Sequence, residues 1–192
     1  MDRNDLLTQP LETFLDRLAT PGGGLAGGSA AAGVVAMAAG LIAMTARASR
    51  GIWEEAGGVT AQAEALRARA MELALEDADA FEEVVLELHA RGDGAAGKDA
   101  ALAVKLDRAA DVPLQITRAA ADAASLAADT ARHCNPDHRA DAVGACMLAE
   151  GAATASAHLV EVNLKVTGKD PRLGESRELV KSAGESVARS RA

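Results

Sequence analysis

The feature that most constrains this chain is an uncharged stretch of small and apolar residues near its start. It runs from Pro21 through glycines, alanines and Ser29 into an apolar segment, and the first charge after it is Arg47. Glycine has no Cβ, so the backbone can turn sharply there and another helix or a ligand can come close. If a helix begins directly after the glycines, its free N–H groups point into whatever lies there. The stretch therefore predicts a tight turn leading into a close-packed helix from about Ser29 to Ser49.

The segment Leu25–Ala46 is also long enough and uncharged enough to be considered as a membrane span. Ala, Gly and Ser dominate it, however, and they gain little from lipid, whereas spans normally carry more Leu, Ile and Phe. No basic segment precedes it, and Asp5, Glu12 and Asp16 lie upstream, which is not typical of a signal peptide. We therefore predict a buried central helix, no membrane partner and a cytoplasmic protein.

The composition indicates one domain, residues 1–192, with an interior built from small side chains. Aromatic residues make up 2% of the chain and Tyr is absent, so Ala, Leu and Val must fill the core through close helix contacts. The net charge of −8 argues against a nucleic-acid partner, which would need a basic face. Cys134 and Cys146 form no recognisable disulfide framework and are expected to be free thiols in a reducing compartment.

The predicted fold class is all-α: a helical bundle with long antiparallel helices around a small-residue central helix. Besides the central helix, helices are expected from Pro10 to about residue 19, over about 60–89, over about 99–132, after Pro136 to about Val166, and from Pro171 onward. Gly57-Gly58 is expected to break the chain, and residues 91–97 are expected to form a loop. Pro113 is expected to kink or split its helix.

The segment with the most reactive side chains follows residue 132. If a helix begins there, Asn135 is its N-cap, Pro136 is its first residue, and Asp137, His138 and Asp141 lie close on one face. Helix capping explains Asn135 and Asp137 fully. It explains Asp141 less well, because an apolar stretch follows that residue. A carboxylate against apolar packing has a raised pKa and is suited to proton transfer.

Two other kinds of site are not predicted. His133, Cys134, Asp137 and His138 could all bind a metal, but their spacing matches no common zinc pattern and no second ligand pair stands elsewhere. The glycines match neither a P-loop, since no Lys-Ser/Thr follows, nor a dinucleotide-binding turn, since no strand precedes them. We therefore expect no metal and no nucleotide.

Two further polar features remain open to interpretation. An acidic cluster formed by Glu76, Asp77, Asp79, Glu82 and Glu83 is interpreted mainly as a solvated helix face. Asp79 is close to Phe81, which indicates that one carboxylate of the cluster turns inward. Asn163 lies in an apolar segment and needs hydrogen-bond partners if it is buried. It is either part of a structural network or a ligand contact.

The order of these motifs resembles the cyclodeaminase domain of formiminotransferase-cyclodeaminase and the related methenyltetrahydrofolate cyclohydrolases, over nearly the whole chain. The segments that carry the resemblance are Phe14–Ala19 with Thr20-Pro21 and the glycines, Ala26–Ala31, Asp77–Phe81, Val112–Leu114, Asn135–Gly144 and Val160–Leu164. The resemblance implies an all-helical homodimer that acts on one-carbon tetrahydrofolates and needs no cofactor or metal.

The resemblance also implies roles for individual residues. Asp141 is the first candidate for proton transfer, and His138 is a candidate for a proton relay. Gly27, Gly28, Ser29 and Asn135 would orient the pterin or the one-carbon unit, Arg139 would bind the folate carboxylates, and Asn163 is kept as a further binding residue. The Gly27–Ser29 turn and the Asn135–Asp141 helix start are expected to form two walls of one site.

The reaction itself stays open between two possibilities. A cyclodeaminase closes N10 of 5-formiminotetrahydrofolate onto the formimino carbon and releases ammonia, whereas a cyclohydrolase opens the methenyl bridge with water. An alternative is a non-catalytic helical dimer of the same family that binds another ligand or partner. It is motivated by Cys134, Ala140 and Leu159, which replace polar or turn residues of the family pattern.

Overall fold

The computed structural model describes residues 9–89, 99–164 and 170–192, and it is helical almost throughout. Its elements are α2 Leu11–Ala19, α3 Gly27–Ala48, α4 Ala56–His89, α5 Asp99–His133, the 3₁₀ turn η2 Pro136–His138, α6 Arg139–Leu164 and α7 Pro171–Arg191. No strand occurs in these residues. The predicted all-α class is therefore confirmed, whereas the loop expected at 91–97 and the helix end expected at Val166 lie outside the described residues.

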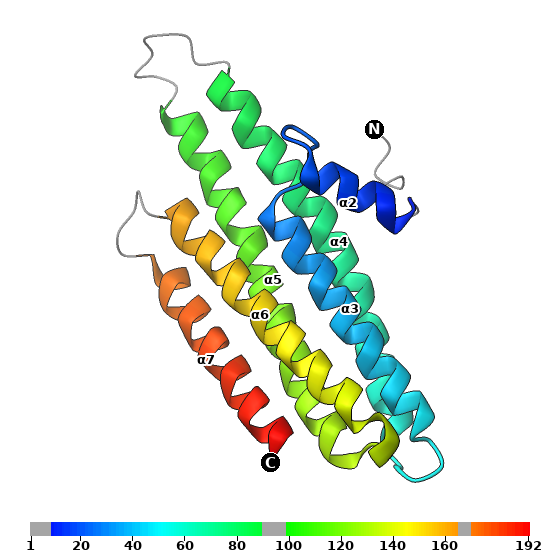
Figure 1. Ribbon diagram of the computed structural model, residues 1–192. Coiled ribbons are helices and arrows are strands. Elements are labelled where there is room, and N and C mark those ends of the chain that lie inside the picture. The colour runs from blue at the N-terminus through cyan, green and yellow to red at the C-terminus, as the bar shows by residue number, and fades with distance from the viewer. Residues whose placement is uncertain (1–8, 90–98, 165–169) are drawn as a thin grey trace.

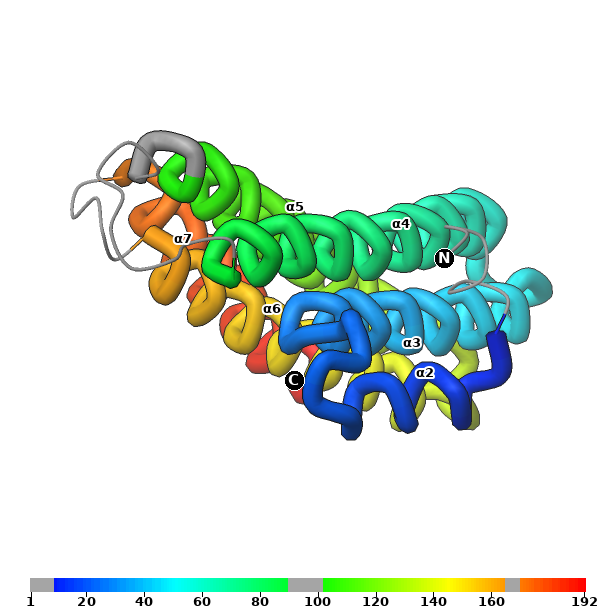
Figure 2. Tube along the Cα trace, turned by 90° about the horizontal axis from the view of Figure 1, so that it is seen from above, coloured from blue at the N-terminus to red at the C-terminus, as the bar shows by residue number. Residues whose placement is uncertain are grey.

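Four long helices form the body of the molecule. Helices α3, α4, α5 and α6 pack side by side with alternating direction, and α7 packs on α5 and α6 (Figure 1). Helix α2 lies outside this bundle beside α3, and none of its residues is buried (Figure 2). Because α3 and α6 run in opposite directions, the start of α3 lies near the end of α6. This arrangement decides which functional candidates can meet.

Alanine fills most of the interior, as the composition predicts. The largest fully buried apolar side chains are only Ile42, Leu73, Ile116, Val35 and Val160. Small side chains leave no gaps only where helix axes approach closely. Buried hydroxyls in this core bond to their own helices: Thr45 Oγ1 donates to the Ile42 carbonyl at 2.9 Å, and Ser156 Oγ donates to the Ala152 carbonyl at 2.8 Å. Because of these bonds to their own helices, hydroxyl groups can lie among alanines with their hydrogen bonds made.

Helix α3 is the small-residue core helix that the sequence predicts. It carries no charge before Arg47 and packs against α4, α5 and α6. By length and composition α3 and the segment 136–164 could each cross a membrane, but 61% of the most apolar window of α3 is buried inside the bundle. Core helices of bundles are also long and apolar, and the packing of α3 inside the bundle shows that it is such a core helix.

The predicted break at Gly57-Gly58 is wrong, and so is a split of the helix at Pro113. Helix α4 begins at Ala56, so Gly57 and Gly58 lie in its first turn rather than in a break. Ala56 and Val59 are buried, and this packing continues the helix through the two glycines. Helix α5 also runs without a break through Pro113. The continuity of α5 at Pro113 involves a side chain of α6, Asn163.

Candidate functional site

A small apolar pocket lies where α3 begins, between α3, α4, α5 and α6. Its volume is about 260 Å³. Its lining residues are Ala26, Gly27, Gly28, Asp77, Ala80, Phe81, Val84, Ala109, Pro113, Leu159, Val162 and Asn163. Only Asp77 and Asn163 among these carry polar side chains, so they determine what the pocket can bind or do.

Asp77 is the buried acid of this pocket. It is 7% exposed and reaches from α4 to the first turn of α3. Its Oδ2 accepts two hydrogen bonds from Ser29, one from the backbone N–H at 2.7 Å and one from Oγ at 3.0 Å. The Ser29 hydroxyl also lies 3.1 Å from the Ala74 carbonyl. Because these bonds fix the carboxyl group, Asp77 serves as the N-terminal cap of α3, which has no cap of its own.

Gly28 is required by the position of this carboxyl group. A Cβ at residue 28 would lie 2.0 Å from Asp77 Oδ1 and 2.4 Å from its Cγ. Neither distance is compatible with a side chain, so only glycine lets the carboxyl group approach the helix start this closely. Gly27 is less constrained, since its added Cβ would make an ordinary contact with Leu159 at 3.5 Å. The glycine that touches the functional group is thus Gly28.

Burial raises the pKa of Asp77 above its ordinary value, although the hydrogen bonds from Ser29 act in the opposite direction. Among the described residues that line the pocket, none carries a positive charge to offset the carboxylate. The partial positive charge at the start of α3 and the two hydrogen-bond donors of Ser29 compensate in part for the charge of the carboxylate. A carboxyl group in this setting can hold a proton at higher pH than an exposed aspartate and can release it to a bound molecule.

This pKa direction predicts a pH dependence of stability. A carboxyl group with a raised native pKa stabilises the fold most below its unfolded value of about 3.9. Its contribution is then lost as the pH rises through the native value. Asp170, whose pKa is lowered to about 2 by Arg172, contributes in the opposite sense, so stability is lost as the pH falls towards that value.

We therefore expect the free energy of unfolding of Asp77→Asn, relative to wild type, to rise between pH 4 and pH 7. Urea unfolding of both proteins across this range measures the difference, in which the Asp170 contribution cancels. The matched variant Asp129→Asn, at an exposed position on α5, controls for a general effect of removing one negative charge. A relative stability of Asp77→Asn that falls over this range would contradict the assignment.

Asn163 explains why α5 continues through Pro113. Proline has no backbone N–H, so the carbonyl of Ala109, one turn earlier, loses its helical donor. Asn163 Nδ2 donates to this carbonyl at 2.6 Å. The bond ties the end of α6 to the middle of α5. Asn163 also lines the pocket. Of the two interpretations of Asn163 from sequence, the structure shows the structural one directly.

A double-mutant cycle tests this pairing. Asn163→Ala is expected to cost about 1–3 kcal/mol of stability, because it leaves the Ala109 carbonyl without a donor. Pro113→Ala supplies a backbone N–H to the same carbonyl, so in its background the cost of Asn163→Ala should be smaller by at least about 0.5 kcal/mol. Denaturant unfolding of the four proteins measures the coupling, and strictly additive effects would show that the two residues are independent.

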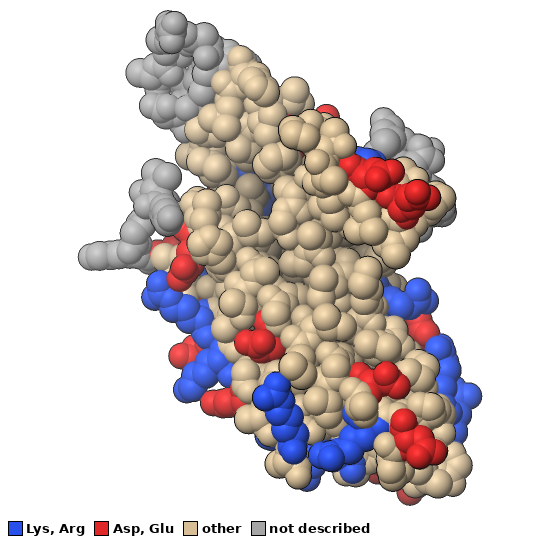
Figure 3. Space-filling view, in the orientation of Figure 1, with Lys and Arg blue, Asp and Glu red and all other residues tan. Residues whose placement is uncertain are grey.

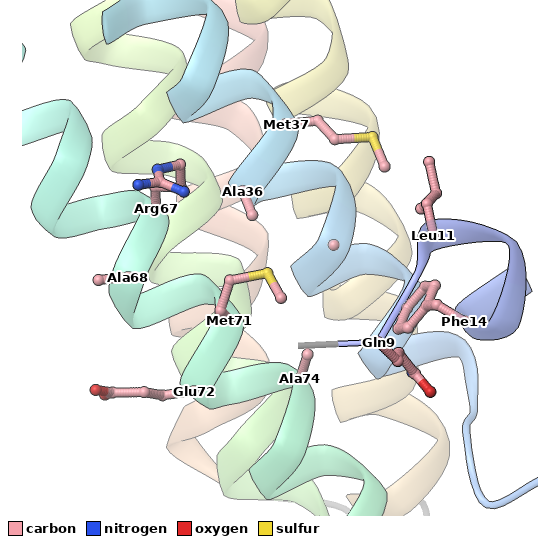
Figure 4. Close-up of a pocket in the computed structure, with 11 residues that line it drawn as sticks. Gln9, Leu11, Phe14, Ala36, Met37, Arg67, Ala68, Met71, Glu72 and Ala74 are labelled. Atoms are coloured by element: carbon pink, nitrogen blue, oxygen red, sulfur yellow. The ribbon is translucent and has the colours of Figure 1, made fainter. Parts of the chain in front are cut away.

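A second and larger pocket lies between α2, α3 and α4, with a volume of about 530 Å³. Figure 4 shows Phe14 and Leu11 on its α2 side and Met71 and Ala74 on its α4 side. Its charged residues, Arg67 and Glu72, are paired with Glu64 and Arg69 on the surface of α4. None of the described residues that line this pocket is a buried titratable group, so these residues offer binding volume without groups for proton transfer.

The remaining candidates from the sequence lie at the opposite end of the bundle. The Asn135 N–H donates to Ser49 Oγ at 2.9 Å, which places the helix start of α6 beside the end of α3. The Asn135 side chain caps η2 by accepting from the Asp137 N–H at 3.0 Å. Arg139 donates to the backbone carbonyls of Ala131 and Ser190. In the structure, Asn135 and Arg139 thus take part in capping and in contacts between helices.

Asp141 does not have the surroundings that the sequence predicts. Its side chain is 49% exposed, and its Oδ2 lies 4.0 Å from Nδ1 of His138, itself 35% exposed. Asp141 precedes Leu159 by 18 residues, which corresponds to about 27 Å along α6. The prediction that Asp141 faces apolar packing is therefore wrong. So is the prediction that Gly27–Ser29 and Asp141 form two walls of one site within a chain.

The same end holds the ring contact of the single tryptophan. Trp53 stacks on His133 with ring centroids 5.5 Å apart, and His133 Nδ1 lies 2.9 Å from the Asp129 carbonyl. Cys134 and Cys146 are both buried free thiols. Among the described residues, no three His, Cys, Asp or Glu side chains lie close enough to hold a metal ion.

Asp77 is the residue that the sequence interpretation missed. The sequence predicts an inward carboxylate near Asp79 and Phe81, whereas in the structure the inward carboxylate is Asp77, two residues earlier. Asp77 lies seven residues after Ala70 and three before Ala80, both buried, and therefore on the core face of α4. That helical spacing is the signal that could have found it.

The fold and the site define the class of this protein: it is an all-helical bundle in which a buried carboxyl group faces a small apolar pocket. Residues 10–178 match the formiminotransferase-cyclodeaminase family. The chain therefore belongs to this family. A solved structure of formiminotetrahydrofolate cyclodeaminase from Thermotoga maritima is similar, with a TM-score of 0.86 and 24% sequence identity, over 96% of this chain and 95% of that one. No curated protein matches.

Proposed function

We propose that the protein is a formiminotetrahydrofolate cyclodeaminase, with the pocket at the start of α3 as its active site and Asp77 as the proton-transfer group. The observation that carries this proposal is the Asp77 carboxyl group, buried, fixed by Ser29 and raised in pKa, in an apolar pocket of about 260 Å³. Family membership and the similarity to a cyclodeaminase structure support the choice of substrate.

The reaction needs protons to move around one carbon atom. N10 of 5-formiminotetrahydrofolate attacks the formimino carbon, which gives a tetrahedral centre bonded to N5, N10 and the amino group. N10 gives up its proton and the amino group gains one before it leaves as ammonia. The protonated Asp77 carboxyl group donates to the departing nitrogen, and the resulting carboxylate accepts the proton from N10. No electron is gained or lost, so this chemistry needs no redox cofactor.

The pocket has room for the one-carbon unit and part of the pterin, because about 260 Å³ does not accommodate a whole folate. Gly27 and Gly28 would let the substrate approach the backbone of α3, and Asn163 would present Oδ1 to it. The remainder of the substrate would extend out of the pocket. Apolar neighbours such as Phe81 and Leu159 would keep water from competing with N10.

The direct test is turnover. Purified protein is mixed with 5-formiminotetrahydrofolate, and the methenyl chromophore of the product and the released ammonia are followed together. Formation of both above the buffer rate supports a cyclodeaminase. Hydrolysis of 5,10-methenyltetrahydrofolate without any ammonia release from the formimino substrate would assign a cyclohydrolase instead. No turnover of either compound, under conditions where the protein binds folate, would favour the non-catalytic alternative.

We also propose that two copies of the chain associate through α3 and α6. Between its first turn and Arg47, the accessible residues of α3 that do not line the α2 pocket are all uncharged: Ala30, Val34, Gly40, Leu41 and Met44. A groove of about 380 Å³ between the two helices adds Met147 and Leu148. Figure 3 shows a largely uncharged area across the middle of this face, with most charges towards its edges. Uncharged faces of this extent are typical of subunit contacts.

The oligomeric state tests this contact. Leu148→Glu, at an exposed groove position, is expected to convert a dimer into a monomer, because it would place a charge in an apolar contact. Val104→Glu, at an exposed apolar position outside the groove, serves as the matched control and should leave the dimer intact. Light scattering after size-exclusion chromatography measures the mass, and an unchanged mass for Leu148→Glu would contradict the proposed contact.

A further inference from the structure

The Ser29 hydroxyl group has one hydrogen and two acceptors within reach. Its Oγ lies 3.0 Å from Oδ2 of Asp77 and 3.1 Å from the carbonyl oxygen of Ala74. Ser29, Ala74 and Asp77 are all buried. A hydroxyl group has a single O–H donor, so it makes a full hydrogen bond to only one of these acceptors at a time. The acceptor that attracts the hydrogen more strongly therefore receives it.

The protonation state of Asp77 decides between the two acceptors. A hydrogen bond to an ionised carboxyl group is about twice as strong as one between neutral groups, so the hydroxyl group donates to Oδ2 when Asp77 is ionised. That advantage disappears when Asp77 is protonated, and the Ala74 carbonyl is then the alternative acceptor. Ala74 lies inside α4, where its carbonyl keeps a helical N–H donor in either case. It is thus not left unpaired when the hydroxyl group turns away.

The backbone N–H of Ser29 cannot turn in this way. It donates to Oδ2 of Asp77 at 2.7 Å from the first turn of α3, and the helix fixes its direction. One donor of Ser29 therefore holds the carboxyl group in place, while the other responds to its charge. The proposed reaction uses both states of Asp77, because the acid gives a proton to the departing nitrogen and the carboxylate takes one from N10.

We infer that Ser29 is a positioning residue for Asp77 in both protonation states, with a hydroxyl group that donates to Oδ2 when Asp77 is ionised and to the Ala74 carbonyl when Asp77 is neutral. This role rests on the proposed function, in which Asp77 gives up and regains a proton. Ser29 acts through the acid and not on the substrate. Its hydroxyl group stabilises the carboxylate that forms during each turnover.

The titration of Asp77 is a direct measure of this bond. Burial and the two donors of Ser29 are what shift the pKa of Asp77. Helix α3 has no charge before Arg47. The charged residues near the pocket on α4, α5 and α6 are not among its lining residues. Several are in ion pairs: Glu76 with Arg69, Glu83 with Arg108, Glu87 with Lys105, Asp111 with Arg172 and Glu161 with Arg177. The others are Asp79, Glu82 and His158.

Ser29→Ala tests the role through the pH dependence of its cost. The variant removes a donor from the ionised carboxyl group, so the pKa of Asp77 should rise by about one pH unit. The loss in the free energy of unfolding should therefore be larger at pH 7 than at pH 4, and this difference should vanish in the Asp77→Asn background. Thr45→Val is the matched control, because it removes a buried hydroxyl group of α3 that bonds only to backbone carbonyls. Its cost should not change with pH.

NMR on the wild type tests the role without any variant of Ser29. Labelling with ¹³C at aspartate Cγ gives the pKa of Asp77, whose resonance is identified by its loss in Asp77→Asn. The Ser29 Cβ resonance should titrate with the same midpoint. A Ser29 Cβ resonance that does not respond would overturn the inference, even if Ser29→Ala failed to fold. A cost of Ser29→Ala that is independent of pH would overturn it as well.

Turnover separates this inference from the proposed reaction. The kcat of the wild type should fall as the pH rises through the pKa of Asp77, and in Ser29→Ala this fall should lie about one pH unit higher. Turnover with a Ser29 Cβ resonance that does not titrate would reject the role of Ser29 alone. The expected NMR titration without turnover of either folate would reject the reaction and leave the response of the hydroxyl group established.

Discussion

Asp77→Asn is expected to lower the turnover of 5-formiminotetrahydrofolate by at least ~100-fold, with a smaller change in KM. Asparagine keeps the size of the side chain and can still accept from Ser29, but it neither donates nor accepts a proton in the reaction. The loss should therefore appear in kcat. Stopped-flow measurement of the methenyl product gives the rate, and circular dichroism shows whether the variant is folded.

Two further variants make this result specific. Asp122→Asn, on the exposed surface of α5, is expected to keep wild-type turnover. Asp141→Asn tests the assignment that the sequence resemblance implies for the exposed carboxylate at the other end of the bundle. A large loss in Asp141→Asn together with normal activity in Asp77→Asn would place the chemistry there and refute the role of Asp77.

Gly28→Ala should damage both stability and activity. The new methyl group would lie 2.0, 2.4 and 2.7 Å from Asp77 Oδ1, Cγ and Oδ2, so the carboxyl group would have to leave its place. That movement breaks the two hydrogen bonds with Ser29 and leaves the start of α3 without a cap. We expect a loss of about 1–3 kcal/mol, the range for overpacking. Thermal unfolding and the turnover assay measure the two effects.

Gly27→Ala is the matched control, one residue earlier in the same helix turn. Its methyl group would contact Leu159 at an ordinary 3.5 Å, so stability should change by less than about 1 kcal/mol. The double variant Gly28→Ala with Asp77→Ala removes the group that the methyl group meets. It should recover part of the stability lost by Gly28→Ala, though not the activity. Equal losses for Gly27→Ala and Gly28→Ala would contradict the close approach of Asp77.

Most of the fold can be predicted from the sequence, because the spacing of apolar residues and the positions of Gly and Pro indicate the same helices along most of the chain. It fails at Gly57-Gly58, where the burial of Ala56 and Val59 outweighs the cost of two glycines in a first turn. It also fails to predict that α5 stays unbroken at Pro113, because the donor that compensates for proline comes from Asn163 on another helix. Neither effect is contained in the local sequence, since both depend on tertiary contacts.

The candidate site was predicted in part. Gly27, Gly28, Ser29 and Asn163 do meet around one pocket. The segment from Asn135 to Asp141 is predicted as a site because it contains many reactive residue types. A helix start also favours those residues for capping. Asp77 lies within a run of acidic residues, most of which suit an exposed helix face. What distinguishes Asp77 from its acidic neighbours is its place in the helical period, which puts it on the buried face of α4.

The stack of Trp53 on His133 determines what optical spectroscopy can observe in this protein. Trp53 is the single tryptophan and the chain has no tyrosine, so intrinsic emission comes essentially from one indole. That indole lies at the end of the bundle where α3 finishes and α6 begins, far from the pocket. Its fluorescence therefore reports the opening of that end of the bundle. Because this indole is far from the pocket, ligand binding there has to be followed by nuclear magnetic resonance or by the absorbance of the ligand itself.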